Sequence, residues 1–597
     1  LNNDNTTIEK SLMTPDKKEL LSNTNTNTTN DFTAIPIHTT SSPIISSPSS
    51  PSSPSPSSLT QSHHMILLKG APDVLLPKCT HYLDDEGAYH PITTTFINMV
   101  NEAYIVYGKQ GERAIGFAMR TLSRTFQEEE REHADFKLHL KQSLTSTDSD
   151  QAAADFCFVG LISLIDPPRE EVSEAVSACH TAGVKVVMVT GDHPVTATSI
   201  ARKIGIITHP TRNMLAEYRD VTLDQIPEDD IKSVIIHGSD IPKMTEKDWE
   251  ILVKKEEIVF ARTSPEHKLQ IVRQFTAAGY VVAMTGDGVN DAPALRQAAI
   301  GVAMGMNGSD VAREAADIIL LDDNFASIVV AIKEGRLLFD NLKKSVAYTV
   351  SHLLPEVSPV LLFFVLGCPL GMPAIMALCI DLLTELLPAT SLAFEEPESD
   401  IMSRPPRDLK KDKLVATPLM MYAYLIAGLC ETVACFMVYF EVFEHYGISG
   451  AQLLSSHNIY FTDNSPPLPA ALTDRVYNTT EQAFILHTVQ SAFFLTIVCS
   501  QACHIFQVRA RTTSIFSHGL FGNTNTNIGV CCAVVLGLFV VYAPITQHAV
   551  FHSEAAPSIA IFRGTLMSGA LIWGYNEGRK ALSREYPNHP LLKYLNW

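Results

Sequence analysis

Six long apolar stretches in the C-terminal half of this 597-residue chain constrain its fold more than any other feature. Each approaches the ~20 residues that an α-helix needs to cross a hydrocarbon layer about 30 Å thick. They lie near residues 346–366, 372–394, 418–443, 483–507, 527–546 and 559–577. The sequence therefore predicts an all-α membrane domain with six transmembrane helices over residues 341–597, in a multi-pass protein embedded in a lipid bilayer.

The basic residues of the connecting segments predict the orientation of these helices, because Lys and Arg are enriched in cytosolic loops. Residues 395–417, 508–526 and the tail after 577 are basic, whereas the alternate segments 367–371, 444–482 and 547–558 hold only Arg475. The soluble part and the C-terminus are therefore expected on the cytosolic side.

The amino-acid composition argues against one class of partner and distinguishes two polar segments from the rest of the chain. The 45 Lys and Arg against 64 Asp and Glu give a net charge of -19, which argues against a nucleic-acid partner. Residues 1–62 are rich in Ser, Thr, Asn and Pro and are predicted to be mostly disordered, apart from a short strand within 32–37. Residues 126–150 are predicted to be a charged, solvated helix and loop.

The remaining soluble residues predict α/β structure. Residues 63–155 contain the strand-like runs MILLK and AIGFAM and a helix over 96–107, which indicate a small α/β unit. Between 156 and 340, short aliphatic runs alternate with helix-length segments, starting with FCFVGLISLI. Such alternation predicts a doubly wound parallel sheet with ligands at the carboxyl ends of its strands.

The string TGDGVNDAPAL at 285–295 follows one of these runs and precedes a helix. Asp287 and Asp291 supply hard oxygen ligands suited to Mg²⁺, and Asn290 adds a polar contact. A merely capped turn would use the same residue types, but the full string is too specific for that interpretation.

Two further segments carry groups suited to phosphate. In MVTGD, Thr190, Gly191 and Asp192 end a strand where hydroxyl and N–H groups can bind a phosphoryl oxygen. In RTSPEHK, Arg262 and Lys268 can neutralise phosphate charge. Taken alone, such basic residues are more often plain surface charges.

Acidic residues within the apolar stretches predict a cation site. Glu356 lies between Pro355 and Pro359, which we expect to break the helix and free carbonyl groups. Asp381 and Glu385 are four residues apart, hence on one helical face. Three carboxylates on adjacent helices favour a small cation; the alternative is protonated, hydrogen-bonded carboxyls.

Several motifs together resemble those of P-type cation-transporting ATPases. KGAPD at 69–73, DPPR at 166–169, MVTGD, RTSPEHK, TGDGVNDAPAL and DDNFASI at 322–328 occur in the family's order. The membrane segments NLKKSVAYTVSHLLPEVSP and CIDLLTELLPATSLAFEEPESD are most similar to sodium/potassium- and proton/potassium-exchanging catalytic subunits. The resemblance implies a partial nucleotide-binding domain at 63–155 and a haloacid-dehalogenase-like phosphorylation domain at 156–340.

The resemblance also implies roles for individual residues, with ATP and Mg²⁺ as cofactors and Na⁺, K⁺ or H⁺ as transported ions. Catalytic roles fall to Lys268, Asp287 and Thr190. The nucleotide- and phosphate-binding positions are Lys69, Gly70, Arg113, Thr190, Gly191, Asp192, Arg262, Lys268 and Asn290. Asp287 and Asp291 would hold Mg²⁺. The transported cation would meet Ser351, Glu356, Asp381, Glu385 and Gln501. The implied activity is MgATP-driven monovalent cation transport across the plasma membrane.

The chain departs from the family pattern in several respects. Asp-Lys-Thr-Gly-Thr, which carries the phosphorylated Asp, and the actuator Thr-Gly-Glu do not occur in it, and four helices of the family have no counterpart. We therefore expect the chain alone to be inactive. His352 replaces an Asn and His504 an Asp of the sodium pump. The β-subunit-binding string is not recognisable in 444–482, so a β-subunit partner has weak support.

Three other interpretations remain open from the sequence. One is a calcium or proton/potassium P-type pump. Another is a catalytically inert, truncated membrane partner protein. A soluble phosphatase of the haloacid-dehalogenase type would share the sheet and the Mg²⁺ motif, but the apolar stretches count against it.

Overall fold

The computed structural model describes residues 35–36, 63–123, 156–222, 225–410 and 412–586, together with 589, 595 and 597. It divides into two compact units: one contains the described residues up to Arg169 and Val187–Ile319, and the other contains Glu170–Val186 and Leu320–Trp597. The predictions of disorder over 1–62 and of a charged helix over 126–150 fall almost entirely outside the described residues. Within 32–37, the expected short strand is present as β1 (Ile35–Pro36).

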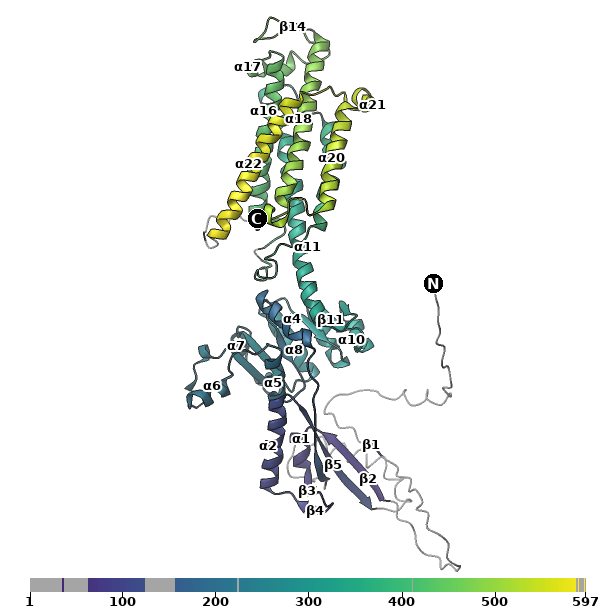
Figure 1. The fold of residues 1–597 in the computed structure, drawn as a ribbon, viewed down its shortest axis with the longest axis vertical. Coiled ribbons are helices and arrows are strands. Elements are labelled where there is room, and N and C mark those ends of the chain that lie inside the picture. The colour runs from purple at the N-terminus through teal and green to yellow at the C-terminus, as the bar shows by residue number, and fades with distance from the viewer. Residues whose placement is uncertain are drawn as a thin grey trace, which may run out of the picture. The chain divides into compact units, whose positions relative to one another are not determined.

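The first unit contains a six-stranded sheet in the order β1-β2-β5-β6-β3-β4 (Figure 1). Its other strands are β2 (His63–Gly70), β3 (Cys79–Leu83), β4 (Tyr89–Pro91), β5 (Arg113–Ser123) and β6 (Phe156–Leu164). Leu68, Leu75, Phe156 and Phe158 form its buried core. The predicted helix is α2 (Thr94–Gln110), which begins where the Thr93 side chain accepts from Phe96 N and ends at Gly111 with φ 84°.

Strand β6 corrects one assignment made from the sequence. Its run was assigned to the parallel sheet, but β6 pairs antiparallel with β5 and parallel with β3. Phe156 and Phe158 on β6 are buried in the core of the six-stranded sheet. An aliphatic run predicts a buried strand without specifying its neighbours, which explains the error.

The rest of this unit alternates strands with helices, as the pattern predicts, and the strands of its first sheet run parallel. Strands β7 (Val187–Val189), β9 (Glu257–Ala261) and β8 (Ser233–His237) form one sheet in the order β7-β9-β8. A second sheet has the order β10-β11-β12, from β10 (Ala283–Gly286), β11 (Ile300–Met304) and β12 (Ile318–Leu320). The expected single doubly wound sheet is therefore present as two three-stranded sheets among the described residues, and the haloacid-dehalogenase-like fold stays a prediction.

In the second unit, α4 (Glu170–Thr181) packs against the long helix α11 (Ala326–Ser351). Arg336 on α11 donates from Nη2 to the Ala182 carbonyl at 2.7 Å. The sequence had placed the α4 segment with the parallel sheet. Its assignment to the second unit is a long-range packing property that a local pattern does not reveal.

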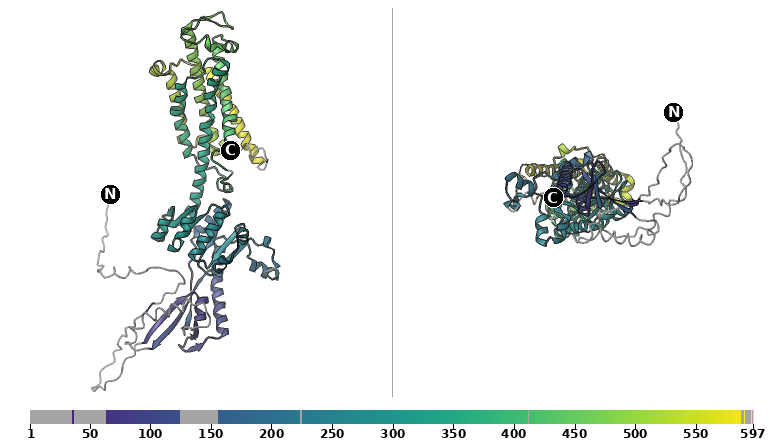
Figure 2. Two further views of the ribbon diagram at one scale, coloured as in Figure 1. Left: turned by 180° about the vertical axis from the view of Figure 1, so that it is seen from behind. Right: turned by 90° about the horizontal axis from the view of Figure 1, so that it is seen from below.

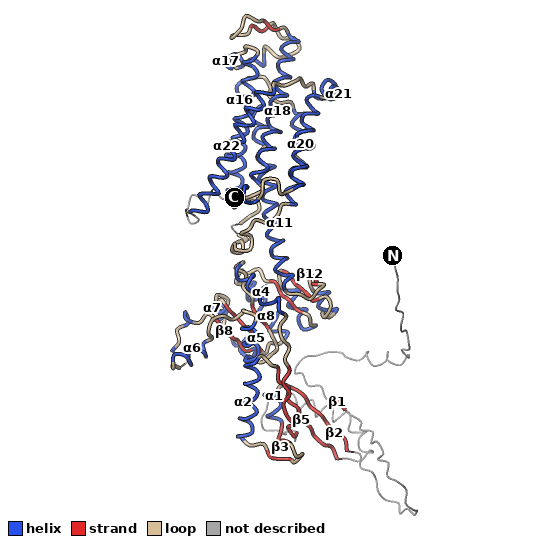
Figure 3. The backbone as a smooth tube through the Cα atoms, in the orientation of Figure 1, coloured by secondary structure: helices blue, strands red, loops and turns tan. Residues whose placement is uncertain are grey.

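The second unit also contains a bundle of long helices, seen from two sides in Figures 1 and 2 and in blue in Figure 3. Helix α18 (Thr479–Val508) contacts α16 (Leu429–His445), α20 (Thr524–Tyr542) and α22 (Ser558–Glu585). Aromatic and aliphatic residues such as Tyr439, Phe443 and Phe493 are fully buried in its core.

Five helical segments among the described residues are long and apolar enough to cross a membrane: 326–366, 374–394, 417–445, 479–508 and 524–542. The sixth predicted span corresponds to α22. It has 28 residues but includes Arg563, Asn576 and Glu577, which lower its apolar character. The count of six transmembrane helices therefore stays a prediction.

Candidate functional site

The predicted phosphate-handling residues of the first unit lie at the ends of strands and the starts of helices. Thr190 follows β7, and its hydroxyl donates to Asp192 Oδ2 at 3.1 Å. The RTSPEHK segment starts helix α8 (Pro265–Ala277), where Ser264 and His267 form a capping box and Pro265 takes the first position. The proline turn expected from the sequence is thus a helix start that presents Lys268 on the first turn.

Three ion pairs connect motifs that are far apart in the sequence. Lys268 Nζ donates to Asp291 Oδ1 at 2.6 Å. Arg113 Nε lies 3.5 Å from Asp192 Oδ1. Arg262 Nη2 donates to Asp73 Oδ1 at 2.8 Å. Arg262 N also donates to the Asp192 carbonyl at 3.0 Å, so the predicted nucleotide and Mg²⁺ segments belong to one polar region of the first unit.

Tyr104 is a member of this region that the sequence did not single out. Its hydroxyl accepts a hydrogen bond from Arg262 Nη2 at 3.2 Å. Burial, reinforced by the neighbouring Asp73 carboxylate, raises the pKa of Tyr104 to about 12. The hydroxyl therefore stays protonated and orients Arg262. Tyr104 lies on α2 at a position typical of a helix core, so the sequence did not indicate that it contacts the phosphate-handling residues.

Asp287 is better placed than Asp291 to bind a magnesium ion. Asp287 follows β10 and is exposed, so its oxygens are available. Asp291 is buried and already accepts from Lys268 Nζ and, at 3.3 Å, from Gly288 N. Lys69 is exposed on β2, and Arg113 is 70 % exposed, so both can reach a nucleotide. Gly70 instead pairs with Gly116 inside the sheet.

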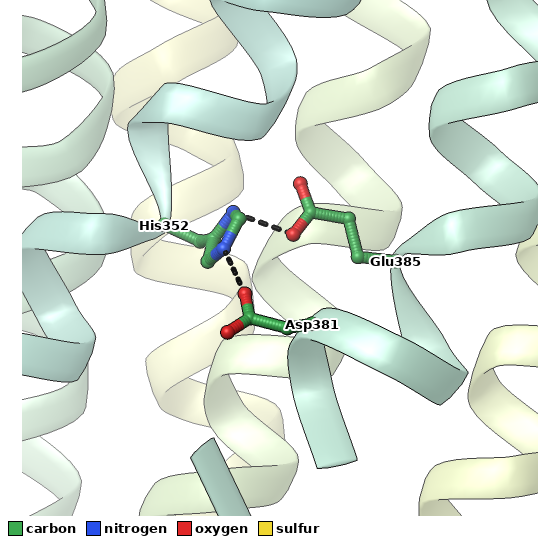
Figure 4. A group of neighbouring side chains, drawn as sticks. All are labelled: His352, Asp381 and Glu385. Carbon is green, nitrogen blue, oxygen red and sulfur yellow. Dashed lines mark hydrogen bonds and ion pairs between the residues drawn. The ribbon is translucent and has the colours of Figure 1, made fainter. Parts of the chain in front are cut away.

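In the second unit, the predicted membrane residues converge on His352, which joins α11 to α12 (Leu353–Leu366). His352 Nδ1 lies 2.8 Å from Glu385 Oε2, and Nε2 lies 3.1 Å from Asp381 Oδ1 (Figure 4). Glu356 Oε2 is 3.8 Å from Nε2. The three predicted carboxylates therefore surround one imidazole.

The backbone around this cluster differs from the expected proline break. Helix α12 continues through Pro359, and Pro355 lies in its first turn, where its missing N–H is tolerated. The interruption is at His352 instead. Asp381 lies in a π-helical turn, η6 (Ile380–Thr384), with Glu385 directly after it. Both acids reach His352, which confirms that they share a face; π-turns of this kind are frequent at functional sites.

A second buried polar cluster lies next to the first. Gln501 Nε2 donates to Ser351 Oγ at 3.1 Å and to Glu431 Oε2 at 2.7 Å. His504 Nδ1 lies 3.1 Å from Ser351 Oγ and 3.3 Å from Glu431 Oε1. The predicted residues Ser351 and Gln501 therefore belong here, and Glu431 finds its partners in this cluster.

Several buried oxygens of these clusters have no hydrogen-bond partner within the described part of the chain. They are Glu356 Oε1, Glu385 Oε1, Glu431 Oε1 and Gln501 Oε1. A small cavity is lined by Glu385, Gln501, Thr384 and Tyr348, among others. Unpaired buried oxygens are costly unless a cation, proton or water meets them. Of the residues with unpaired oxygens, Glu385 and Gln501 line this cavity.

Comparison with known proteins gives two family matches. The family described as cation transporting ATPase, C-terminus, matches residues 369–582, and the P-type ATPase cytoplasmic domain N matches residues 50–171. The chain belongs to the P-type cation-transporting ATPases. The second match includes β6, in accord with its place in the six-stranded sheet.

Individual P-type ATPases match most of the chain. A rat potassium-transporting ATPase alpha chain 2 is 39% identical over 528 residues, and a rat sodium/potassium-transporting ATPase subunit alpha-4 is 40% identical over 527 residues. Each alignment covers 88% of this chain but 49% and 50% of the relative. The human sodium/potassium-transporting ATPase subunit alpha-4 is 39% identical, again over 88% of this chain and 50% of the relative. The chain therefore spans about half the length of the relatives it matches.

Proposed function

We propose that this chain forms the membrane cation site and part of the nucleotide site of an ATP-driven monovalent cation pump of the sodium/potassium- or proton/potassium-exchanging type. The similar proteins are potassium-transporting and sodium/potassium-transporting ATPases, which supports transport of sodium or potassium ions. The observation that carries the proposal is the group of buried, unpaired oxygens of Glu356, Glu385 and Gln501 in helices long enough to cross a membrane.

On this proposal, Glu385 and Gln501 bind the transported cation at the cavity, and Glu356 and Asp381 complete its oxygen ligands. Intramembrane carboxylates are expensive to bury, and a cation offsets that cost. The two clusters share Ser351 as a neighbour, because Ser351 directly precedes His352 and its hydroxyl contacts His504.

In the first unit, the proposal assigns MgATP to the polar region around Lys268 and Asp287. Asp287 would hold Mg²⁺, which neutralises phosphate charge when it is bound. Lys268 and Arg113 would face the phosphates, and Lys69 with Gly70 would lie at the nucleotide base. The Asp-Lys-Thr-Gly-Thr nucleophile does not occur in this chain, so phosphoenzyme formation would need that motif from elsewhere.

We further propose a plasma-membrane location with the first unit and the C-terminus in the cytosol, as the distribution of basic loops indicates. Six transmembrane helices stay a prediction from the apolar stretches. A haloacid-dehalogenase-like phosphorylation domain and a β-subunit partner at residues 444–482 stay predictions from the family resemblance.

Equilibrium binding of Rb⁺, a congener of K⁺, to the purified chain in lipid nanodiscs tests the membrane part. We expect saturable Rb⁺ binding that Glu385→Gln weakens by about tenfold, because the buried site loses one negative charge. Glu444→Gln removes an exposed carboxylate of the same unit and serves as the matched control. If wild-type chain binds no Rb⁺ or Na⁺, the transport proposal fails and an inert membrane partner becomes the better interpretation.

A further inference from the structure

Two strands of the first unit each have one edge without a strand neighbour in the described part of the chain. In the sheet β7-β9-β8, β7 pairs only with β9, and in the sheet β10-β11-β12, β10 pairs only with β11. Each strand therefore has a row of backbone N–H and C=O groups at a free edge. Neither strand contains a charged residue or a proline, which are the residues that usually protect an edge from pairing.

The hydrogen bonds of the two sheets show which backbone groups point to the free edges. Thr190 N, directly after β7, donates to the Phe260 carbonyl on β9 at 2.9 Å. Because successive residues of a strand point their backbone groups to opposite sides, those of Val189 point to the free edge of β7. The Val282 carbonyl accepts from an amide at the start of β11, so by the same alternation Thr285 points to the free edge of β10.

Helices cover the two faces of the first sheet. Val187 and Val189 of β7 pack, together with Ile258 and Phe260 of β9, against the apolar core to which α8 belongs. Helix α5 (Pro194–Lys203) leads from β7 toward β8 and contacts β8 and β9, but it contributes none of the described residues of that core. Helices α5 and α8 therefore cover opposite faces of this sheet.

This arrangement of helices determines where β10 lies. Crossovers between parallel strands are nearly always right-handed, so helices on opposite faces carry the chain in opposite directions across a sheet. The chain moves toward β8 through α5, and it therefore moves through α8 in the other direction, past β7 to β10. Helix α9 (Ala292–Gln297) contacts α8 and so lies on the same face, which takes β11 beyond β10. The free edges of β7 and β10 thus face each other.

Contacts of the α8 segment show that the two strands also run in the same direction. Thr263 N donates to the Thr190 carbonyl after β7 at 3.0 Å, and Lys268 Nζ donates to Asp291 after β10. The carboxyl ends of both strands therefore lie at the start of α8. Val282, directly before β10, packs against the same core as the valines of β7. A strand placed between β7 and β10 would run parallel to both.

The composition of the chain indicates where such a strand comes from. A parallel strand covered by helices on both faces is a continuous run of aliphatic residues. The segments outside the described residues, chiefly 1–34, 37–62 and 124–155, contain no run of more than three apolar residues. The strand that suits this position therefore belongs to a polypeptide segment outside these 597 residues.

We propose that the free edges of β7 and β10 together bind one extended aliphatic segment of a second polypeptide. The segment enters as a parallel strand about as long as β10 and joins the two three-stranded sheets into one. Backbone hydrogen bonds to both edges supply the affinity, as in other cases of strand addition. This interaction goes beyond the proposed function and requires neither ion nor nucleotide binding.

The test is fluorescence polarisation of a labelled peptide, Val-Ile-Val-Ile-Val with lysines at both ends, mixed with the full chain in nanodiscs. We expect saturable binding of one peptide per chain. Two N-methylated peptides, carrying methyl groups on alternate residues of the aliphatic run, each lack the N–H groups of one strand edge. A strand inserted between two partners uses both edges, so each methylated peptide should bind at least tenfold more weakly. A peptide paired with a single edge would tolerate one of the two, and that result would overturn the insertion.

Hydrogen exchange locates the bound peptide without any substitution in the protein. We expect slower exchange in residues 187–190 and 283–286 and no change in 233–237 of β8, at the opposite edge of the first sheet. Protection of 233–237 alone would overturn the proposal.

A matched pair of variants tests the free edge of β7 directly. Val189→Pro removes an N–H from that edge and should weaken peptide binding by about fivefold. Ile235→Pro is the control, because Ile235 is also half-buried and points its N–H to the outer edge of β8. Equal affinities in the two variants, or no binding of the unmethylated peptide to the wild type, would overturn the proposal. Rb⁺ binding by the same sample reports separately on the proposed function.

Discussion

The buried carboxylate of Glu257 on β9 is expected to contribute strongly to the stability of the first unit. Thr208 N donates to it at 2.9 Å and His209 N at 3.1 Å, and the hydroxyls of Thr208 and Ser233 also contact it. The carboxylate therefore connects β9, β8 and the loop around His209. Glu257→Gln removes the charge while nearly preserving the shape.

The magnitude follows from the ionisation of Glu257. Burial favours the neutral acid, but the hydrogen bonds from Ser233, Thr208 and His209 outweigh it and lower the pKa of Glu257 from 4.5 to about 2. Each pKa unit corresponds to about 1.4 kcal/mol. The ionised form thus contributes about 3 kcal/mol to the free energy of unfolding at pH 7, as an upper bound.

The pH dependence has a definite sign, because the pKa of Glu257 is lower in the folded than in the unfolded protein. The contribution is complete above pH 4.5, since both states are then ionised. It declines as the pH falls from 4.5 toward 2, because the unfolded state takes up the proton first. At pH 3 the difference between wild type and Glu257→Gln should shrink to about 1 kcal/mol.

Hydrogen exchange of β8 and β9 amides, measured by mass spectrometry on the full chain and corrected for intrinsic rates, follows this opening reaction. At pH 7 we expect Glu257→Gln to exchange these amides about a hundredfold faster. Glu256→Gln is the control, because this neighbour is 62 % exposed and pairs with Lys232 only at 3.6 Å. A change below about 0.5 kcal/mol in Glu257→Gln at pH 7 would refute the reasoning.

Two further predictions concern the membrane helices and the nucleotide region. In Gly428→Ala the added methyl group would lie 2.7 Å from the Ser351 carbonyl oxygen. The thermal midpoint should therefore fall by the equivalent of about 1–3 kcal/mol. In Gly574→Ala the added methyl group has no atom within 4 Å, so this control variant should not be destabilised. Lys268→Ala removes the partner of buried Asp291 and should weaken MgATP binding by about tenfold in a fluorescent-nucleotide titration. Lys243→Ala, at a 73 % exposed side chain, should leave that affinity unchanged; equal losses in both lysine variants would contradict the assignment of Lys268.

The sequence predicted local elements well because their signals are local. Helix α2 and the strands before Thr190 and Asp287 lie where the apolar runs and turn residues indicate. The partners of those elements were harder to predict. Strand β6 joins the six-stranded sheet because Phe156 and Phe158 fill its core, and no feature within the run itself distinguishes that sheet from the parallel one.

In the candidate sites, too, the sequence predicted local features but not the contacts between distant elements. The sequence named Glu356, Asp381 and Glu385 as one cluster because charge within an apolar segment is a strong signal. It expected the helix to break at the prolines, whereas the chain bends at His352 and forms a π-turn at Asp381. Those backbone details determine which atoms meet, and they depend on packing between helices.

The two buried histidines show why the residue type alone does not identify an ion site. At His504, Tyr422 Oη lies 3.0 Å from Nε2, so the tyrosine can donate to that nitrogen while Nδ1–H faces Ser351 and Glu431. A neutral ring is then satisfied entirely by the protein. At His352 both nitrogens face carboxylates, which accept when ionised, so only an imidazolium, with two N–H groups, can donate to both. The groups that face the two ring nitrogens, rather than the residue type, therefore determine which protonation state of a buried histidine the protein stabilises.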